Sequence, residues 1–160
     1  PEVVLKLSEI LDFILYQSNE PRIEIEKELE LLNAYIELES LRHGDKLGVT
    51  FHHEIDDIKM TIAPLLLLPL VENAFKHGIS PTNNKSGIVL DLRVKSGKLQ
   101  FTSKNQKGKN LPSGPIKSSN SGIGITNLKR QLALNYPKKY DFRVLDNEEK
   151  FEVQLQLELL

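Results

Sequence analysis

Residues 69–78 read Pro-Leu-Val-Glu-Asn-Ala-Phe-Lys-His-Gly, and the rest of the fold is organised around this stretch. At about 100° per residue it predicts an amphipathic helix that begins near Pro64 and ends at Gly78. The apolar arc of this helix holds Leu67, Leu70, Val71, Ala74 and Phe75. The opposite, polar arc holds Glu72, Asn73, Lys76 and His77. This mixture of carboxylate, amide, ammonium and imidazole suits a phosphate and its metal ion, although a solvated face with one ion pair gives the same pattern.

A second motif, Ser-Gly-Ile-Gly-Ile-Thr-Asn, occupies residues 121–127. Its glycines let the backbone approach a ligand, and amides at the start of a helix can receive anionic oxygens. It differs from a dinucleotide-binding fingerprint, because Asn127 stands in place of the third glycine and a polar tract precedes the motif. A glycine-rich loop that merely begins a helix is the alternative interpretation.

The segments around these motifs predict an α+β fold. Helices are expected at residues 2–17, 24–43, 64–77 and 124–135, and strands at residues 47–55, 60–63, 89–95, 99–103, 142–145 and 151–157. Residues 105–121 form a long polar tract rich in Gly, Pro, Ser, Asn and Lys. We therefore expect a two-layer α/β sandwich: a mixed, mostly antiparallel sheet with helices on one face, plus an N-terminal helical segment.

Composition excludes several classes of protein. The chain is 39% apolar and 27% charged, with a net charge of −1, so no nucleic-acid partner is indicated. It has no cysteine, which excludes disulfides, thiolate zinc sites and cysteine nucleophiles. The longest apolar run, residues 62–71, contains two prolines and is far shorter than the ~20 residues of a membrane helix.

Charge divides the chain into two parts. Residues 1–42 carry 10 acidic and 4 basic side chains, which leaves 12 acidic and 17 basic ones for the remainder. The chain begins at Pro1 and runs at once into a helix, as expected of a fragment from a longer polypeptide. The first helix either packs on the core or forms half of an antiparallel pair that dimerises.

Taken together, the two motifs resemble the catalytic region of LytS-type sensor histidine kinases, members of the ATPase superfamily that includes gyrase, one chaperone family and mismatch-repair proteins. Residues 69–78 resemble the family's N box and residues 122–127 its G box. Residues 7–16 look like the end of its dimerisation helices, and residues 28–42 look like its connecting helix. The resemblance implies a truncated dimerisation and phosphoacceptor region at residues 1–20 and an ATP-binding catalytic domain at residues 21–160.

The same resemblance implies roles for individual residues. Asn73 would be the Mg²⁺ ligand, and Glu72 and His77 would be catalytic. The ATP-binding residues implied are Asn73, Lys76, His77, Gly78, Asn105, Gly122, Gly124 and Asn127. Residues 105–121 would form a mobile lid whose Lys107, Lys109 and Lys117 offset the charge of the triphosphate, or else these lysines only keep a disordered loop in solution.

Two departures from the family pattern matter. Asn105 stands where the superfamily has an aspartate that accepts a hydrogen bond from the adenine amino group, and an amide accepts that bond more weakly than a carboxylate. None of the histidines of this chain has the setting of the phosphoacceptor, which would lie upstream. These histidines are His43, His52, His53 and His77. The adjacent pair, His52 and His53, lies on opposite faces of its strand and cannot chelate one ion.

The resemblance therefore implies the ATP-binding catalytic region of a two-component kinase that positions Mg-ATP for a histidine outside this chain. It further implies a homodimer formed through the N-terminal helices, a response-regulator partner, and the cytoplasmic portion of an inner-membrane sensor. Asn105 leaves a second hypothesis open, that of a degenerate, nucleotide-poor module that signals through dimerisation and partner binding.

Overall fold

The computed structural model describes residues 1–44, 47–78, 86–106 and 122–159. The helices are α1 (Glu2–Gln17), α2 (Ile25–His43), α3 (Leu68–Gly78) and α4 (Gly122–Asn135). The strands are β1 (Ile23–Glu24), β2 (Leu47–Ile55), β3 (Thr61–Ile62), β4 (Ser86–Lys95), β5 (Lys98–Gln106), β6 (Tyr140–Asp146) and β7 (Lys150–Glu158). Among the described residues, no helix is long and apolar enough to cross a membrane.

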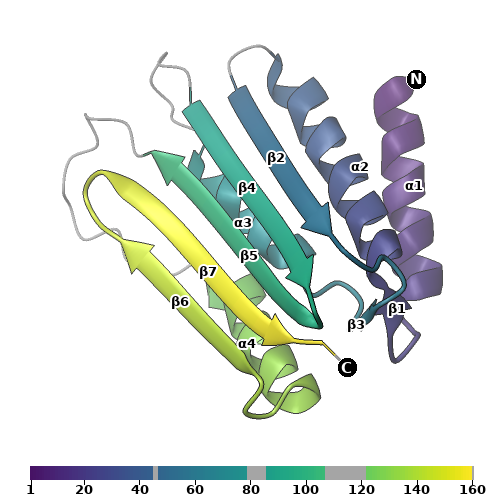
Figure 1. The fold of residues 1–160 in the computed structure, drawn as a ribbon. Helices are drawn as coiled ribbons and strands as arrows, with labels where there is room; N and C mark the ends of the chain where they lie inside the picture. Colours follow the sequence, from purple (N-terminus) through teal and green to yellow (C-terminus); the bar gives the residue numbers. More distant parts are fainter. Residues whose placement is uncertain (45–46, 79–85, 107–121, 160) are drawn as a thin grey trace.

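Most of the described strands form one mixed sheet. Its five strands lie in the order β2-β4-β5-β7-β6, as Figure 1 shows. β2 pairs with β4 in parallel, whereas the other neighbours are antiparallel. The short strands β1 and β3 pair separately, joining the start of α2 to the segment that leads into α3. The α+β fold with a mixed, mostly antiparallel sheet is thus confirmed.

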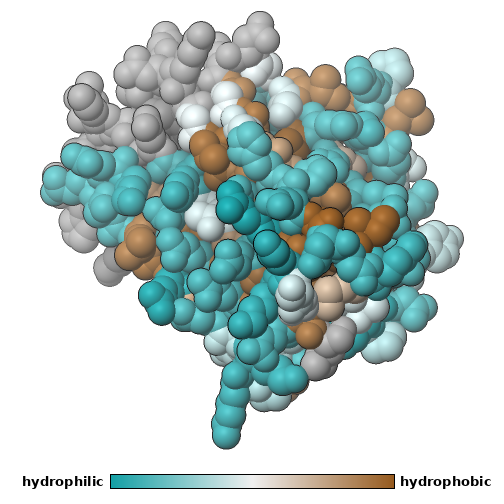
Figure 2. Space-filling view, viewed as in Figure 1, coloured by the Kyte–Doolittle hydropathy of each residue, from teal (hydrophilic) through white to brown (hydrophobic). Residues whose placement is uncertain are grey.

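The helices form the second layer. α3 contacts β4 and β5, and α2 and α4 both pack against α3, while α1 packs on α2 (Figure 1). The core lies between α3 and the sheet, where the largest side chains are almost fully buried; they include Leu70, Phe75, Leu90, Phe101 and Leu155. The view in Figure 2 is mostly hydrophilic, because alternate residues of these strands point away from the helices.

Two expected boundaries are wrong, for physical reasons. The third helix begins at Leu68 and not near Pro64, because Leu65 has φ 58° and its backbone N–H is bonded to a side chain of α2. The polar tract does not start at Asn105, because β5 continues to Gln106 through pairing with strands on both sides. Residues 107–121 of the predicted lid, with Lys107, Lys109 and Lys117, lie outside the described residues.

The remaining predicted elements are confirmed with small shifts. The hairpin turns at Ser96 and Gly97, which both have positive φ, as a two-residue turn requires. Gly44 follows α2 with φ 61°, and its N–H donates to the carbonyl of Ser40.

Candidate functional site

The polar arc expected on α3 is divided between two environments. Glu72 and Lys76 are exposed, but Asn73 is only 6% exposed, so its placement on a solvated arc is wrong. Its Nδ2 is buried and finds no hydrogen-bond partner among the described residues. Asn73 and His77 stand one helical turn apart on the side of α3 that faces the sheet and β7.

The side chain of His77 connects α3 with the sheet through a ring contact. Its ring stacks on Phe151 of β7, with ring centroids 4.4 Å apart and planes 18° from parallel. Phe151 is the register partner of Asn105 on β5, so the histidine lies above the end of β5. The structure thereby brings two of the predicted site residues, His77 and Asn105, to the same place.

Asn105 has an unusual environment for an amide. It is 2% exposed, lies between Ile88 of β4 and Phe151 of β7, and neither Oδ1 nor Nδ2 has a partner within the described part of the chain. Ser103, two residues earlier on the same face, is fully buried, and its Oγ also has no hydrogen-bond partner among the described residues. Unsatisfied buried polar atoms cost about 1–3 kcal/mol each, so these atoms call for hydrogen-bond partners from outside the described residues.

Gly78 explains how the end of α3 comes so close to the sheet. A Cβ atom at this position would lie 2.5 Å from Cγ1 of Ile88 and 3.4 Å from Cβ of Asn105. Since Ile88 is fully buried and cannot swing away, only glycine permits this approach. Gly78 therefore sets the distance between α3 and the Asn105 amide.

Glu72 points to another neighbour, the helix α2. Partial burial of its carboxyl group, together with the charge of Glu39, raises the pKa of Glu72. Glu39 is 7% exposed and is held by Arg42 and His43, at 3.3 and 3.2 Å. Burial, together with the charges of Glu39 and Glu72, raises the pKa of the Tyr35 phenol. Glu72 thus belongs to a separate acidic cluster between α2 and α3 and does not share the environment of Asn73.

The residues of the second motif begin α4, which packs beside α3. Gly124 and Asn127 are exposed, and a Cβ atom at Gly124 would meet nothing within 4 Å among the described residues. Packing against the described residues therefore does not demand glycine at position 124. Gly122 is the first residue of α4, two residues before the expected start of this helix.

A fully buried carboxylate, Glu28 of α2, lies at the start of α3. Its Oε2 accepts a hydrogen bond from the N–H of Leu65 at 3.0 Å, and its Oε1 accepts one from Leu67 at 2.8 Å. Burial raises the pKa of Glu28 to about 7, although these backbone N–H groups oppose the rise.

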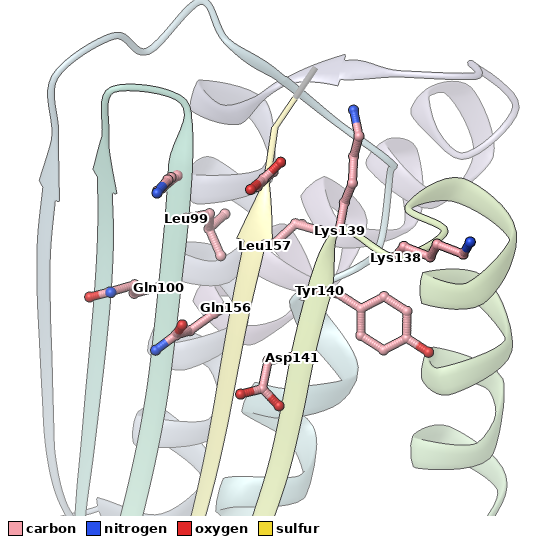
Figure 3. Close-up of a pocket in the computed structure, with 10 residues that line it drawn as sticks. Leu99, Gln100, Lys138, Lys139, Tyr140, Asp141, Gln156 and Leu157 are labelled. Atoms are coloured by element: carbon pink, nitrogen blue, oxygen red, sulfur yellow. The ribbon is translucent and has the colours of Figure 1, made fainter.

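An open hollow lies at the opposite end of the sheet. Figure 3 shows its lining where β5 begins and β7 ends, with Gln100, Gln156 and Asp141 in one row across three strands. None of the predicted site residues lines it. Among the described residues, no group of three His, Asp or Glu side chains is arranged to hold a metal.

Sequence reasoning missed Ser103 and Phe151. Like the predicted Asn105, Ser103 occupies an inward position of a strand whose other inward residues, Leu99 and Phe101, are apolar, so the alternation was a readable signal. Phe151 is also inward-facing, but its stacking on His77 depends on tertiary structure alone.

Comparison with known proteins places these features in context. Residues 1–47 match the family model described as histidine kinase. The sensor histidine kinase YpdA of Escherichia coli is 34% identical over 91 residues, which are 57% of this chain and 16% of YpdA. The sensor protein LytS of Oceanobacillus iheyensis is 32% identical over 92 residues, 56% of this chain and 15% of that protein. The aligned region is thus about one sixth of the length of these curated relatives.

Solved structures share the fold at low identity. The histidine kinase domain of the blue-light activated kinase EL346 from Erythrobacter litoralis superposes with a TM-score of 0.59 at 16% identity, covering 99% of this chain and 73% of that one. The catalytic domain of histidine kinase ThkA gives 0.56 at 11% identity, with 86% and 94% covered. By a sequence match in its N-terminal part and by fold over nearly its whole length, the chain is similar to sensor histidine kinases such as LytS and YpdA.

Proposed function

We propose that the chain is the ATP-binding catalytic region of a sensor histidine kinase, which positions Mg-ATP so that a histidine outside this chain attacks the γ-phosphate. Phosphoryl transfer of this kind depends almost entirely on positioning and on electrostatic stabilisation. The similarity to histidine kinases supports this proposal, and so does the placement of His77 and Gly78 at Asn105, with the buried Asn73 one turn before His77.

The buried amide of Asn105 is the observation that carries the proposal. Its Oδ1 is an acceptor and its Nδ2 a donor, and both lack partners among the described residues. Adenine offers a complementary pair, an amino group that donates and ring nitrogens that accept, and asparagine is well suited to pair with both. A carboxylate at this position would accept only, so an asparagine is compatible with base recognition.

Asn73 is the candidate Mg²⁺ ligand. An amide oxygen is a suitable hard ligand, and Mg²⁺ commonly takes few protein ligands because phosphate oxygens and waters complete its octahedron. The metal would neutralise developing charge on the phosphates. His77 and Lys76 lie one turn further along α3 and are proposed to contact phosphate or ribose. Gly122, Gly124 and Asn127 are proposed to offer backbone amides and a side chain at the start of α4.

Glu72 is proposed as an acid–base group near the γ-phosphate, as the family resemblance suggests. Its raised pKa brings the carboxyl closer to neutral pH, where proton exchange is most efficient. Its position on the α2 side of α3 requires the γ-phosphate to extend toward α2.

The partners proposed are a second copy of the chain and a response regulator. α1 packs on α2 with Ile10 buried, and it leaves a further stripe of exposed apolar side chains: Val4, Leu7, Leu11 and Leu15. This spacing suits pairing with a second helical hairpin. A relative by fold, ThkA, is known in a complex with the response regulator TrrA.

Calorimetric titration with ATP, with and without Mg²⁺, tests the proposal. The chain should bind ATP, and Mg²⁺ should strengthen that binding. Asn105→Ala should weaken it about tenfold or more, since both base contacts are lost. Gln100→Ala is the matched control, because this amide lies on the exposed face of the same strand. If the parent does not bind ATP, the degenerate signalling module becomes the better hypothesis.

A further inference from the structure

Hydrogen bonds from two helices, α2 and α4 with the residue that follows it, hold the segment that leads into α3. Ala63 donates its N–H to the hydroxyl of Tyr136 at 2.8 Å, and Gln131 of α4 donates from Nε2 to the carbonyl of Pro64 at 3.2 Å. From the other side, Glu28 of α2 accepts the N–H groups of Leu65 and Leu67. The backbone that leads into α3 is thus held on both sides within five residues.

The contact made by Glu28 differs from the apolar packing of α3. Leu70, Val71 and Phe75 are buried in apolar packing, with the ring of Phe75 5.8 Å from that of Tyr35 on α2, and such contacts have no preferred direction along the helix axis. The two hydrogen bonds of Glu28 are directional, and each carboxylate oxygen takes a different amide. They fix how far along the sheet α3 begins.

The conformation of Leu65 shows that this contact is specific. Leu65 has φ 58°, in the left-handed region that L-residues avoid because Cβ approaches the following carbonyl oxygen. The strained conformation presents its N–H to the carboxylate of Glu28, which is 0% exposed. The structure therefore combines a strained backbone conformation with a fully buried carboxyl group at this one attachment.

At the other end of α3, the tolerance for movement is small. The approach of Gly78 to Ile88 and Asn105 leaves no room for a single added carbon atom. An α-helix of this length is a rigid rod, so a displacement of its start moves its end by a similar amount. Asn73, His77 and Gly78 all depend on that placement.

We propose that Glu28 is a positioning residue for the nucleotide site: by holding the amides of Leu65 and Leu67 it fixes α3 relative to α2. α3 in turn carries the buried Asn73 and places His77 and Gly78 at Asn105. The inference rests on the proposed function for its nucleotide readout. It also gives α2 a route to the site, since α2 connects the N-terminal helix α1 to the start of α3.

The test replaces Glu28 by glutamine, which keeps the shape but can accept only through one atom, so one of the two amides loses its partner. The control is Glu30→Gln, the same chemical change at an exposed position on the same helix. Amide hydrogen exchange at Leu65 and Leu67, resonances of the Asn73 and Asn105 side-chain amides, and Mg-ATP affinity are measured for each variant. Glu28→Gln should speed exchange and weaken Mg-ATP binding by about tenfold each, and it should shift both side-chain resonances.

Glu28→Asp provides a second variant in case glutamine prevents folding. It keeps the charge and both oxygens but shortens the side chain by one methylene, so the amides stay protected while α3 is displaced. Its side-chain resonances should move and its affinity should fall. A folded Glu28 variant that keeps parental Asn73 and Asn105 resonances would overturn the proposal and leave Glu28 a purely structural group. If the parent itself fails to bind Mg-ATP, the proposed function fails, whereas exchange and resonances still decide the role of Glu28.

Discussion

The two ends of α3 both bury polar groups, yet they treat them differently. At the start, the carboxylate of Glu28 has a backbone N–H on each oxygen. At the end, the amide of Asn105 is equally buried and has no hydrogen-bond partner among the described residues. Two equally buried polar groups therefore differ in the completeness of their hydrogen bonds, and this difference supports a structural role for Glu28 and a ligand-binding role as the proposal for Asn105.

This difference separates mutations that should affect binding from mutations that should affect stability. Changes at the Asn105 end remove groups that bond to no other group in the described part of the chain. Changes at the Glu28 end remove groups that hold the fold together. Substitutions at Gln100, in the open hollow, serve as controls for both ends of α3, because the polar groups there are exposed and should affect neither ATP affinity nor stability.

The largest effect is expected for Asn73→Ala. Losing the candidate Mg²⁺ ligand should weaken Mg-dependent ATP binding by about 100-fold or more, as is common when metal sites lose a ligand or its support. The free energy of unfolding should stay within about 1 kcal/mol of the parent, because no described protein group depends on the Asn73 Nδ2. Calorimetry and urea denaturation measure the two quantities. Equal ATP affinity in mutant and parent would remove Asn73 from the site.

The stability of the protein should depend on pH through Glu28, which holds the start of α3. The pKa of Glu28 is about 7 in the folded protein and near 4.5 when unfolded, so folding favours its protonated form. The stabilisation of the folded state by the protonated carboxyl of Glu28 is fully present below pH 4.5 and is lost as pH rises through about 7. The free energy of unfolding should therefore decrease by about 3 kcal/mol over this range. Glu28→Gln lacks this titration. Subtracting its stability from that of the parent between pH 4.5 and 8 should isolate the decrease, and a constant difference would contradict it.

Two glycines allow a further comparison, between a position where packing requires glycine and one where the described residues do not. Gly78→Ala should destabilise the protein by about 1–3 kcal/mol, because the new methyl group collides with Ile88. Gly124→Ala meets no described atom and replaces glycine within a helix, so stability should rise by up to about 1 kcal/mol while ATP affinity falls. Thermal denaturation and calorimetry on both variants check this. The comparison fails if the two substitutions change stability equally.

The smallest effect is expected for Asn105→Asp. A charged acceptor strengthens the bond to the adenine amino group but gives up the amide donor, so ATP binding should tighten only severalfold, or about 1 kcal/mol. Gln100→Glu, the same amide-to-acid change on the exposed face of β5, should leave affinity unaltered. Unchanged affinity for Asn105→Asp would mean that another group reads the base.

Periodicity predicted the elements of the fold well, because apolar alternation and helical spacing are local properties of the chain. The parallel pairing of β2 with β4 is a tertiary property, and the start of α3 depends on Glu28, which lies 37 residues before Leu65. For this reason the segment after Pro64 was wrongly expected to be helical. The division of the chain at residue 20 stays a prediction.

The site was only partly predictable. Sequence spacing grouped Glu72 with Asn73, but adjacent helical residues point about 100° apart, and here they face different helices and strands. The pairing of His77 with Asn105 depends on strand register through Phe151, which no local pattern encodes. The identities of the site residues came from family resemblance, and their roles stay predictions.

Because β2 and β4 run parallel, no tight turn joins them, and the chain returns between them through β3 and α3. The β4–β5 hairpin, by contrast, closes through two residues and can form early in folding. β2 has β4 as its neighbour at the edge of the sheet, and α3 lies in the connection that brings it there. α3 is therefore assembled together with a sheet edge, so a partly unfolded form that releases β2 also loosens α3 and, with it, the proposed ATP site.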